Sequence, residues 1–186
     1  QPVIKCDSVY KIFGENAKKL LQEANGKVDA KEFQDAGCVV GVNSASFEVY
    51  EGEMLVVMGL SGSGKSTLLR CISRLTDTTA GKIYIDGEDL LALNSKELIE
   101  LRRNKMGMVF QSFALLPHKT VLENIAFPLQ VKGSSTNDSM KRAMEMVELV
   151  GLTGRENYFP RELSGGQQQR VGIARSLAVE PDIWFL

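Results

Sequence analysis

The segment GLSGSGKST, residues 59–67, constrains the fold of this chain more than any other stretch. It follows the apolar run EMLVVMG and precedes an apolar-periodic segment, so we expect a buried strand over 53–59, a glycine loop, and a helix over 65–75. Glycines let backbone N–H groups curl around a phosphate chain, and the start of the helix directs its positive end at the same anion. The pattern G-x-x-x-x-G-K-[ST] therefore predicts a loop that binds the phosphates of a nucleotide.

The residue types within this loop suggest individual roles. Lys65 supplies a cation near the β- and γ-phosphates, as a catalytic residue would, and the hydroxyl of Ser66 is the expected ligand of Mg²⁺. A flexible glycine linker is the alternative, but a linker has no reason to carry a lysine at the start of a helix. The residues expected to bind nucleotide here are Gly59, Ser61, Gly62, Ser63, Gly64, Lys65, Ser66 and Thr67.

A second glycine cluster, LSGGQQQR, occupies residues 163–170 at the start of a helix predicted over 165–179. Ser164 is a good N-cap, and Gly165 and Gly166 expose backbone N–H groups at the positive end of that helix. Glycine weakens a helix, so the pair indicates that something approaches closely there. From the residues alone, this end can dock onto the first loop of the same chain or of a second copy.

The remaining secondary structure follows from periodicity and turn residues. Alternation predicts a strand over 43–52, and apolar runs predict strands over 81–87, 105–111 and 182–186. Because a core strand rarely ends a protein on its last apolar residue, we expect the natural chain to continue beyond Leu186.

Three further helices are expected from their start signals or their apolar stripes. Asn94 with Glu97, and Thr120 with Glu123, have the spacing of a capping box, and we expect Pro128 to break the second of these helices. The third helix lies within 137–151 and ends at a glycine. The apolar stripe expected on it consists of Met140, Ala143, Met144, Val147 and Val150.

Composition excludes several classes of protein. The net charge is −1, which argues against a nucleic-acid-binding protein, and no apolar run is long enough to span a bilayer. The N-terminus lacks the pattern of a signal peptide. The three cysteines have no metal-ligand spacing, so we interpret them as reduced thiols of a cytosolic protein.

The motifs LSGGQQQRVGIARSLAVEPD, GLSGSGKST and VFQSFALLPHKTVLEN resemble the signature motif, the phosphate loop and the Q-loop of ATP-binding cassette (ABC) ATPases. The resemblance covers essentially the whole chain. It implies an α/β fold: a P-loop NTPase core with a mostly parallel sheet flanked by helices, an N-terminal antiparallel β part, and an inserted helical subdomain. We expect one ABC ATPase domain over 1–186, with the helical subdomain over 112–162.

The resemblance also implies how ATP and Mg²⁺ are bound. In this family two ATPase domains pack head to tail, so each ATP lies between the phosphate loop of one copy and the signature helix of the other. This chain would form a homodimer and contact nucleotide through Ser164, Gly165, Gly166 and Gln167.

Two further residues match functional positions of the family. Phe13 matches the aromatic residue that stacks on adenine, with Tyr10 as the neighbouring candidate, and an ordinary core side chain is the alternative for Phe13. Gln111 matches the Q-loop glutamine, a catalytic residue of the family that contacts Mg²⁺ or the attacking water; a loop-capping amide is its alternative. His118 does not match the switch histidine of the family, and we expect it on a surface loop.

Other motifs of the family have no counterpart within the sequence. The strand that matches IWFL continues in the family into an Asp-Glu pair, which holds Mg²⁺ and polarises the attacking water. This pair, the D-loop and the switch histidine would follow Leu186. We therefore expect the 186-residue chain alone to show no ATPase activity.

An insert over 14–45 makes the chain most similar to the ATPase subunits of glycine betaine/proline importers, although its amphipathic part can equally be a solvated surface helix. The similarity implies a peripheral subunit on the cytoplasmic face of the plasma membrane. Its partners would be transmembrane permease subunits and, indirectly, an extracytoplasmic substrate-binding protein, with no nucleic acid. We expect the segment after Gln111, with its apolar Phe113, Leu115 and Leu116, to receive the permease. A soluble ABC ATPase of translation or DNA repair is the main alternative, and a small-molecule kinase is a weaker one.

Overall fold

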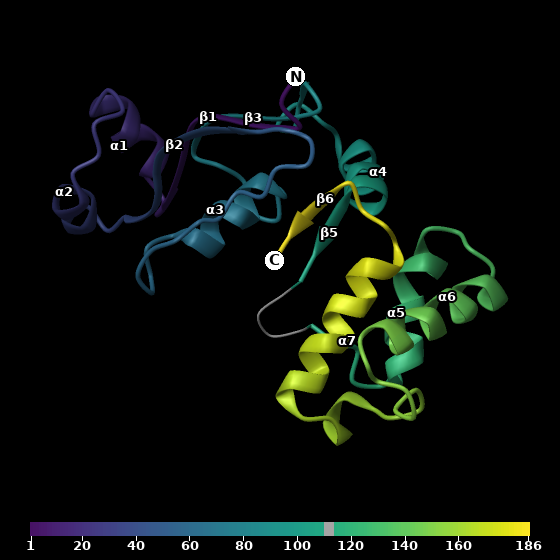
Figure 1. Ribbon diagram of the computed structural model, residues 1–186. Helices are drawn as coiled ribbons and strands as arrows, with labels where there is room; N and C mark the ends of the chain where they lie inside the picture. The colour runs from purple at the N-terminus through teal and green to yellow at the C-terminus, as the bar shows by residue number, and fades with distance from the viewer. Residues whose placement is uncertain (110–113) are drawn as a thin grey trace. The chain divides into compact units, whose positions relative to one another are not determined.

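The computed structural model describes residues 1–109 and 114–186, which divide into two compact units, Gln1–Leu98 and Ile99–Leu186 (Figure 1). Helix α4 (Ser95–Lys105) crosses the division. The other elements of the first unit are β1 (Ile4–Phe13), α1 (Ala17–Glu23), α2 (Ala30–Asp35), β2 (Val39–Val49), α3 (Lys65–Ile72), β3 (Ala80–Ile85) and β4 (Glu88–Asp89). The second unit contains β5 (Met106–Met108), α5 (Val121–Val131), α6 (Thr136–Leu149), the 3₁₀ helix η1 (Pro160–Glu162), α7 (Gly165–Ala178) and β6 (Ile183–Phe185).

The first unit is built on an antiparallel sheet in the order β2-β1-β3-β4. Cys6, near the start of β1, pairs with Phe47 on one side and with the buried Ile83 on the other. Along β2, Phe47 is half-buried while its neighbours Ser46 and Glu48 are exposed, as the alternation in the sequence predicts. The expected N-terminal antiparallel part is therefore confirmed.

The insert over 14–45 contributes to the core of the first unit. Leu21 of α1 and Phe33 of α2 are buried in one cluster with Ile12 of β1 and with Cys38. Asp29 caps α2 by accepting hydrogen bonds from the backbone N–H groups of two residues in its first turn. The insert helices thus bury apolar faces against the sheet and are not merely solvated.

The strand expected over 53–59 is absent, and this prediction was wrong. The segment has no regular structure, and the side chains of Met54 and Met58 are 85% and 86% exposed. A strand requires a neighbour with which its backbone N–H and C=O groups can pair, and no strand within the described part of the chain pairs with this run. The described parallel sheet therefore consists of β5 and β6 alone.

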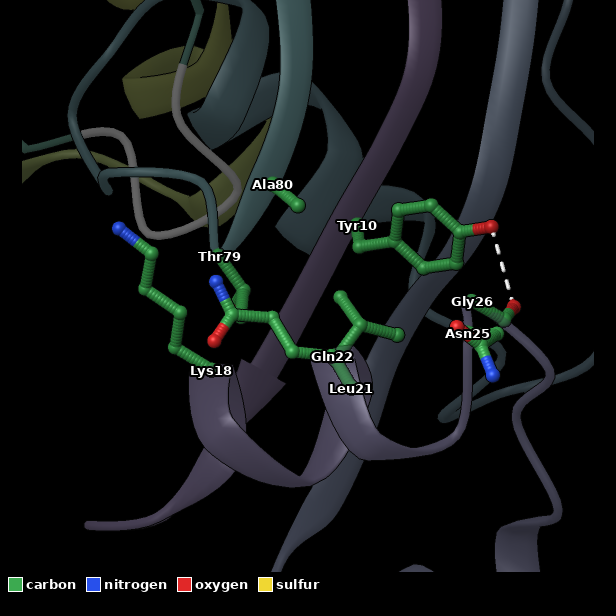
Figure 2. A pocket seen from close by; sticks show the side chains of 8 residues that line it. All are labelled: Tyr10, Lys18, Leu21, Gln22, Asn25, Gly26, Thr79 and Ala80. Carbon is green, nitrogen blue, oxygen red and sulfur yellow. Dashed lines mark hydrogen bonds between the residues drawn. The ribbon is translucent and has the colours of Figure 1, made fainter.

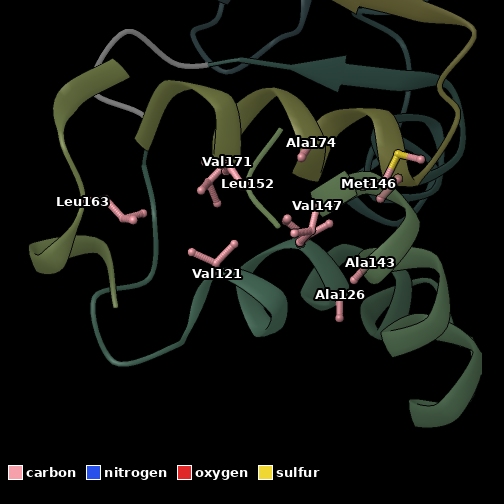
Figure 3. Packing of buried hydrophobic residues seen from close by; sticks show 11 residues of the cluster. Val121, Ala126, Ala143, Met146, Val147, Leu152, Leu163, Val171 and Ala174 are labelled. Atoms are coloured by element: carbon pink, nitrogen blue, oxygen red, sulfur yellow. The ribbon is translucent and has the colours of Figure 1, made fainter. Parts of the chain in front are cut away.

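The second unit combines this short parallel pair with a helical cluster. In the pair, Met106 is opposite Ile183 and Met108 is opposite Phe185, which confirms the expected terminal strand and part of the strand over 105–111. Side chains of α5, α6 and α7 point toward one another around a shared core (Figure 3). Its fully or nearly fully buried members are Val121, Ile125, Ala126, Ala143, Met146, Val147, Leu152, Leu163, Val171, Ala174 and Ala178.

The predictions of where helices start were more accurate than the predictions about helix interiors. Reciprocal capping bonds join Asn94 to Glu97 and Thr120 to Glu123, as expected. Pro128, however, does not end α5: its carbonyl accepts a bond from the N–H of Lys132, and the helix continues through one further turn.

The expected stripe of α6 was wrong at one position. Met144 is 46% exposed, and Met146 faces the core in its place, together with Ala143 and Val147. Met140 and Val150 pack against the cluster while remaining partly exposed.

Candidate nucleotide-binding site

The glycine loop over 59–67 leads directly into α3, as the sequence predicts. Gly64 is the N-cap of α3, with a φ of +89°, and Gly62 has a φ of +80°. A β-carbon on Gly64 would overlap the carbonyl oxygen of Gly41 in β2, so both the backbone conformation and the close approach require glycine at this position. The sheet thereby fixes the start of α3, where backbone N–H groups are available to an anion.

The loop curls around its own lysine. The Lys65 ammonium donates hydrogen bonds to the carbonyl oxygens of Gly59 and Leu60, at 2.9 and 2.7 Å. A β-carbon on Gly59 would lie 2.6 Å from the Oγ of Ser63, so the turn is tight. The ammonium is thus held against the backbone of the loop that is expected to bind phosphate.

The Phe13 ring and Thr67 of the glycine loop both lie next to Gly41. A β-carbon on Gly41 would stand 2.9 Å from the Phe13 ring and 3.1 Å from the Thr67 methyl group. The ring is 45% exposed, and the Lys11 ammonium lies 4.9 Å from its centroid. An exposed aromatic face beside the phosphate loop fits a base that stacks there. The sequence reading missed both Gly41 and Lys11, because only the strand pairing brings them to this place.

Tyr10 has a different environment. Its hydroxyl donates to the carbonyl of Gly26, 3.2 Å away, and its ring lines a cavity of about 280 Å³ beside α1 (Figure 2). The other lining residues, of which none belongs to the glycine loop, are Lys18, Leu21, Gln22, Asn25, Gly26, Thr79 and Ala80. Of the two aromatic candidates, Phe13 is the one that lies next to the loop.

The second glycine cluster begins α7 in the second unit. Ser164 and Gln167 form a capping box: the serine hydroxyl accepts from the N–H of Gln167, and the Gln167 side chain accepts from the N–H of Ser164. A β-carbon on Gly165 or Gly166 would meet no atom within 4 Å. No described atom of this chain therefore requires either glycine, although glycine is a poorer helix former than alanine.

The candidate metal ligands are only partly described. The Ser66 side chain lies at the exposed start of α3, whereas Gln111 falls outside the described residues. Within the described ranges there is no cluster of three or more histidine, cysteine, aspartate or glutamate side chains that could hold a metal ion. The residues present suit Mg²⁺ that arrives with a nucleotide, because such an ion takes one or two protein ligands and fills its other positions with phosphate and water.

The described helices include none that is both long enough and apolar enough to cross a bilayer. His118 is exposed, as expected, on the loop that precedes α5. Leu115 packs partly against the helical core, so its apolar character has an explanation within the chain, while Phe113 lies outside the described residues.

Comparison with known proteins shows the family to which the sequence is related. The model of the family described as ABC transporter matches residues 42–186. The Pelagibacter ubique protein named "Trimethylamine N-oxide transport system ATP-binding protein TmoW" is 86% identical over the whole chain, which spans 54% of that protein. The Bacillus subtilis "Glycine betaine transport ATP-binding protein OpuAA" is 51% identical over 98% of the chain, which spans 44% of that protein. The chain thus covers about half the length of these relatives.

A solved structure of an ATP-binding cassette has the same fold as this chain. The dimeric, post-hydrolysis state of the ATP-binding cassette MJ0796 bound to ADP and Pi superposes with a TM-score of 0.80 at 37% identity. The match covers 97% of this chain and 72% of that one.

Proposed function

The chain belongs to the ABC transporter family, and on that premise we propose that it is the nucleotide-binding part of an ATPase subunit that energises a membrane importer. The observation that carries this proposal is the closure of the glycine loop around Lys65 at the start of α3. The loop residues bind and orient the phosphates of ATP, Ser66 contributes a ligand to Mg²⁺, and the Phe13 ring stacks on the adenine.

The transported substrate belongs, in this proposal, to the small methylated nitrogen compounds. The relatives at 86% and 60% identity carry trimethylamine N-oxide in their names, and those at 51% and 49% carry glycine betaine. We therefore place trimethylamine N-oxide ahead of glycine betaine. Substrate choice would reside in the permease and the binding protein, with this subunit attached to the cytoplasmic face of the membrane through the permease.

Head-to-tail dimerisation completes the proposed site. The open space around Gly165 and Gly166 supports it, because two glycines that no described part of the chain requires are explained if a phosphate and a second protomer approach them. The Ser164–Gln167 capping box keeps this helix end in place before the partner arrives.

A docking surface for the permease is proposed on the second unit, consisting of Pro117, His118, Lys119 and Phe127. Pro117 and His118 are exposed, and Phe127 of α5 is 39% exposed, with the Lys119 ammonium 5.9 Å from its ring centroid. An apolar ring beside a cation suits a short amphipathic helix of a membrane partner.

The test uses a completed subunit, by which we mean this chain extended to the length of its relatives. It is reconstituted with its permease in vesicles, and ATP hydrolysis and uptake of trimethylamine N-oxide and glycine betaine are measured. Lys65→Ala should abolish ATP binding, hydrolysis and uptake, whereas the matched surface variant Lys82→Ala should behave as the parent does. Uptake that continues at the parental rate in Lys65→Ala would overturn the proposal.

A further inference from the structure

The segment over 114–120, which carries most of the docking surface, is bound to two different helices of the second unit. At its start, Nη1 of Arg175 in α7 donates a hydrogen bond of 2.7 Å to the carbonyl oxygen of Ala114. One residue later, Leu115 packs against the core that α5, α6 and α7 share. The first half of the segment is thus attached to the helix that begins at the signature motif.

The second half of the segment is held by Asn124 of α5, whose side chain is fully buried. Its Oδ1 accepts from the N–H of Leu116 at 2.8 Å. Its Nδ2 lies within hydrogen-bond distance of the carbonyl oxygens of Leu116, Lys119 and Thr120, at 3.1, 2.9 and 2.9 Å. One buried amide therefore fixes the loop to α5, so the whole segment has little freedom to move independently of the helices.

Arg175 bonds to a residue, Ala114, whose backbone conformation is strained. Ala114 has a φ of +44°, in the left-handed region that costs an alanine about 1–2 kcal/mol, and such a conformation persists only where neighbouring contacts hold it. A hydrogen bond from a charged donor is stronger than one between neutral groups. Partial burial of the guanidinium lowers its pKa.

We propose that Arg175 is a positioning residue that ties the docking segment 114–120 to the signature helix α7. When nucleotide and a second protomer engage the start of α7, the displacement is passed along the rigid helix to Ala114, and from there to Lys119 and its neighbours. This inference rests on the proposed function, since it assigns to the segment the role of permease contact.

The experiment compares three variants of the completed subunit. Arg175→Met removes the donor, Arg175→Lys retains a shorter cationic donor, and Arg142→Met removes a surface arginine of the same unit that pairs with Glu145 and Glu180. ATPase activity is measured without and with permease in vesicles. Amide hydrogen exchange of Leu116 and Lys119, both of which donate backbone hydrogen bonds, is measured with and without ATP.

In Arg175→Met we expect ATPase activity without permease, and its KM for ATP, to stay within about twofold of the parent, while stimulation by permease falls about tenfold. Exchange at Leu116 and Lys119 should be faster and should no longer respond to ATP. Arg175→Lys should recover part of both effects, and Arg142→Met should resemble the parent.

Two outcomes would overturn the inference. In one, Arg175→Met lowers ATPase activity with and without permease by the same factor; in the other, the exchange at Leu116 and Lys119 still responds to ATP in that variant. If the methionine variant fails to fold, Arg175→Lys decides by the same exchange measurement. Absence of permease stimulation in the parent would instead contradict the proposed function, and the exchange measurement would still decide the role of Arg175.

Discussion

The carbonyl oxygen of Gly41 occupies the space that a β-carbon on Gly64 would need. This contact joins strand β2 to the start of α3, and it comes from backbone rather than from a side chain that could turn aside. The position of the phosphate loop therefore depends on the sheet as much as on its own glycines.

Replacement of Gly64 by alanine tests this dependence. The variant must relieve the overlap by moving α3 away from β2, so we expect ATP affinity to fall at least tenfold, as measured by titration with a fluorescent ATP analogue. Gly52→Ala is the matched control, because Gly52 also has a positive φ, of +76°, but a β-carbon there meets nothing within 4 Å. Equal ATP affinity in the two variants would contradict the steric argument.

Variants of Phe13 and Tyr10 test which of the two aromatic side chains stacks on the adenine. Phe13→Ala should weaken ATP binding by about tenfold, since stacking of a base on an aromatic ring contributes about 1–3 kcal/mol, whereas Phe13→Tyr should retain most of the affinity. Tyr10→Ala removes a ring that faces the cavity beside α1 and should leave ATP affinity unchanged. Calorimetric titration of the completed subunit with ATP measures all three, and a larger loss in Tyr10→Ala than in Phe13→Ala would reverse the assignment.

The glycines of the second cluster should show opposite effects on stability and assembly. Gly166→Ala adds a methyl group in open space and removes a poor helix former from the first turn, so the free energy of unfolding should rise by up to about 1 kcal/mol, the difference for a helix interior. ATP-dependent dimerisation, followed by light scattering, should weaken. Gln169→Ala improves helix propensity on the exposed side of the same helix and should leave dimerisation unaltered. Unimpaired dimerisation of Gly166→Ala would remove the reason proposed here for that glycine.

Two buried helix serines provide a matched pair for stability. The Ser139 hydroxyl donates to the carbonyl of Ser135 at 2.7 Å, whereas the Ser176 hydroxyl has no hydrogen-bond partner among the described residues. Replacement of Ser176 by alanine removes an unsatisfied buried group, so this variant should be more stable than Ser139→Ala by about 1 kcal/mol in urea unfolding. The reverse order would show that the Ser176 hydroxyl is satisfied in solution.

The Cys6 thiol should make stability depend on alkaline pH. Burial, and to a lesser degree the neighbouring Cys71, raise the pKa of Cys6 from 9.0 to about 12. Above pH 9 the unfolded chain releases this proton while the folded chain retains it, so the free energy of unfolding should decrease as the pH rises from 9 toward 12. Cys6→Ala should flatten that slope in urea unfolding measured across the range, and an unchanged slope would assign the loss to other groups.

Local signals predicted the features that depend on a few adjacent residues. The capping boxes at Asn94 and Thr120 and the N-cap at Ser164 were predicted correctly because the partners in each lie within four positions of each other. The start of α3 at Lys65 was likewise predicted correctly, since Gly64 caps the helix and the Lys65 ammonium bonds to carbonyl oxygens of the motif itself.

Features that depend on residues far apart in the chain could not be predicted from the sequence. The run over 53–59 has the composition of a buried strand, yet no described strand lies beside it, and composition cannot supply a partner. Pro128 removes one hydrogen bond, but the turn after it is held by Leu129, which packs against the core. Gly41 is inconspicuous in sequence because its importance arises from Gly64 and Phe13, which reach it only after the strands have paired.

The three buried thiols of the first unit have a practical consequence. Cys6, Cys38 and Cys71 are each at most 3% exposed, so an alkylating reagent reaches them only when that unit opens. Cys71 lies on α3, less than two turns after Lys65, whereas Cys38 lies within the insert, in the cluster that contains Leu21 and Phe33. The native cysteines therefore report local unfolding without any engineered label. The alkylation rate of Cys71 reports opening of α3 after the phosphate loop, and that of Cys38 reports opening of the insert.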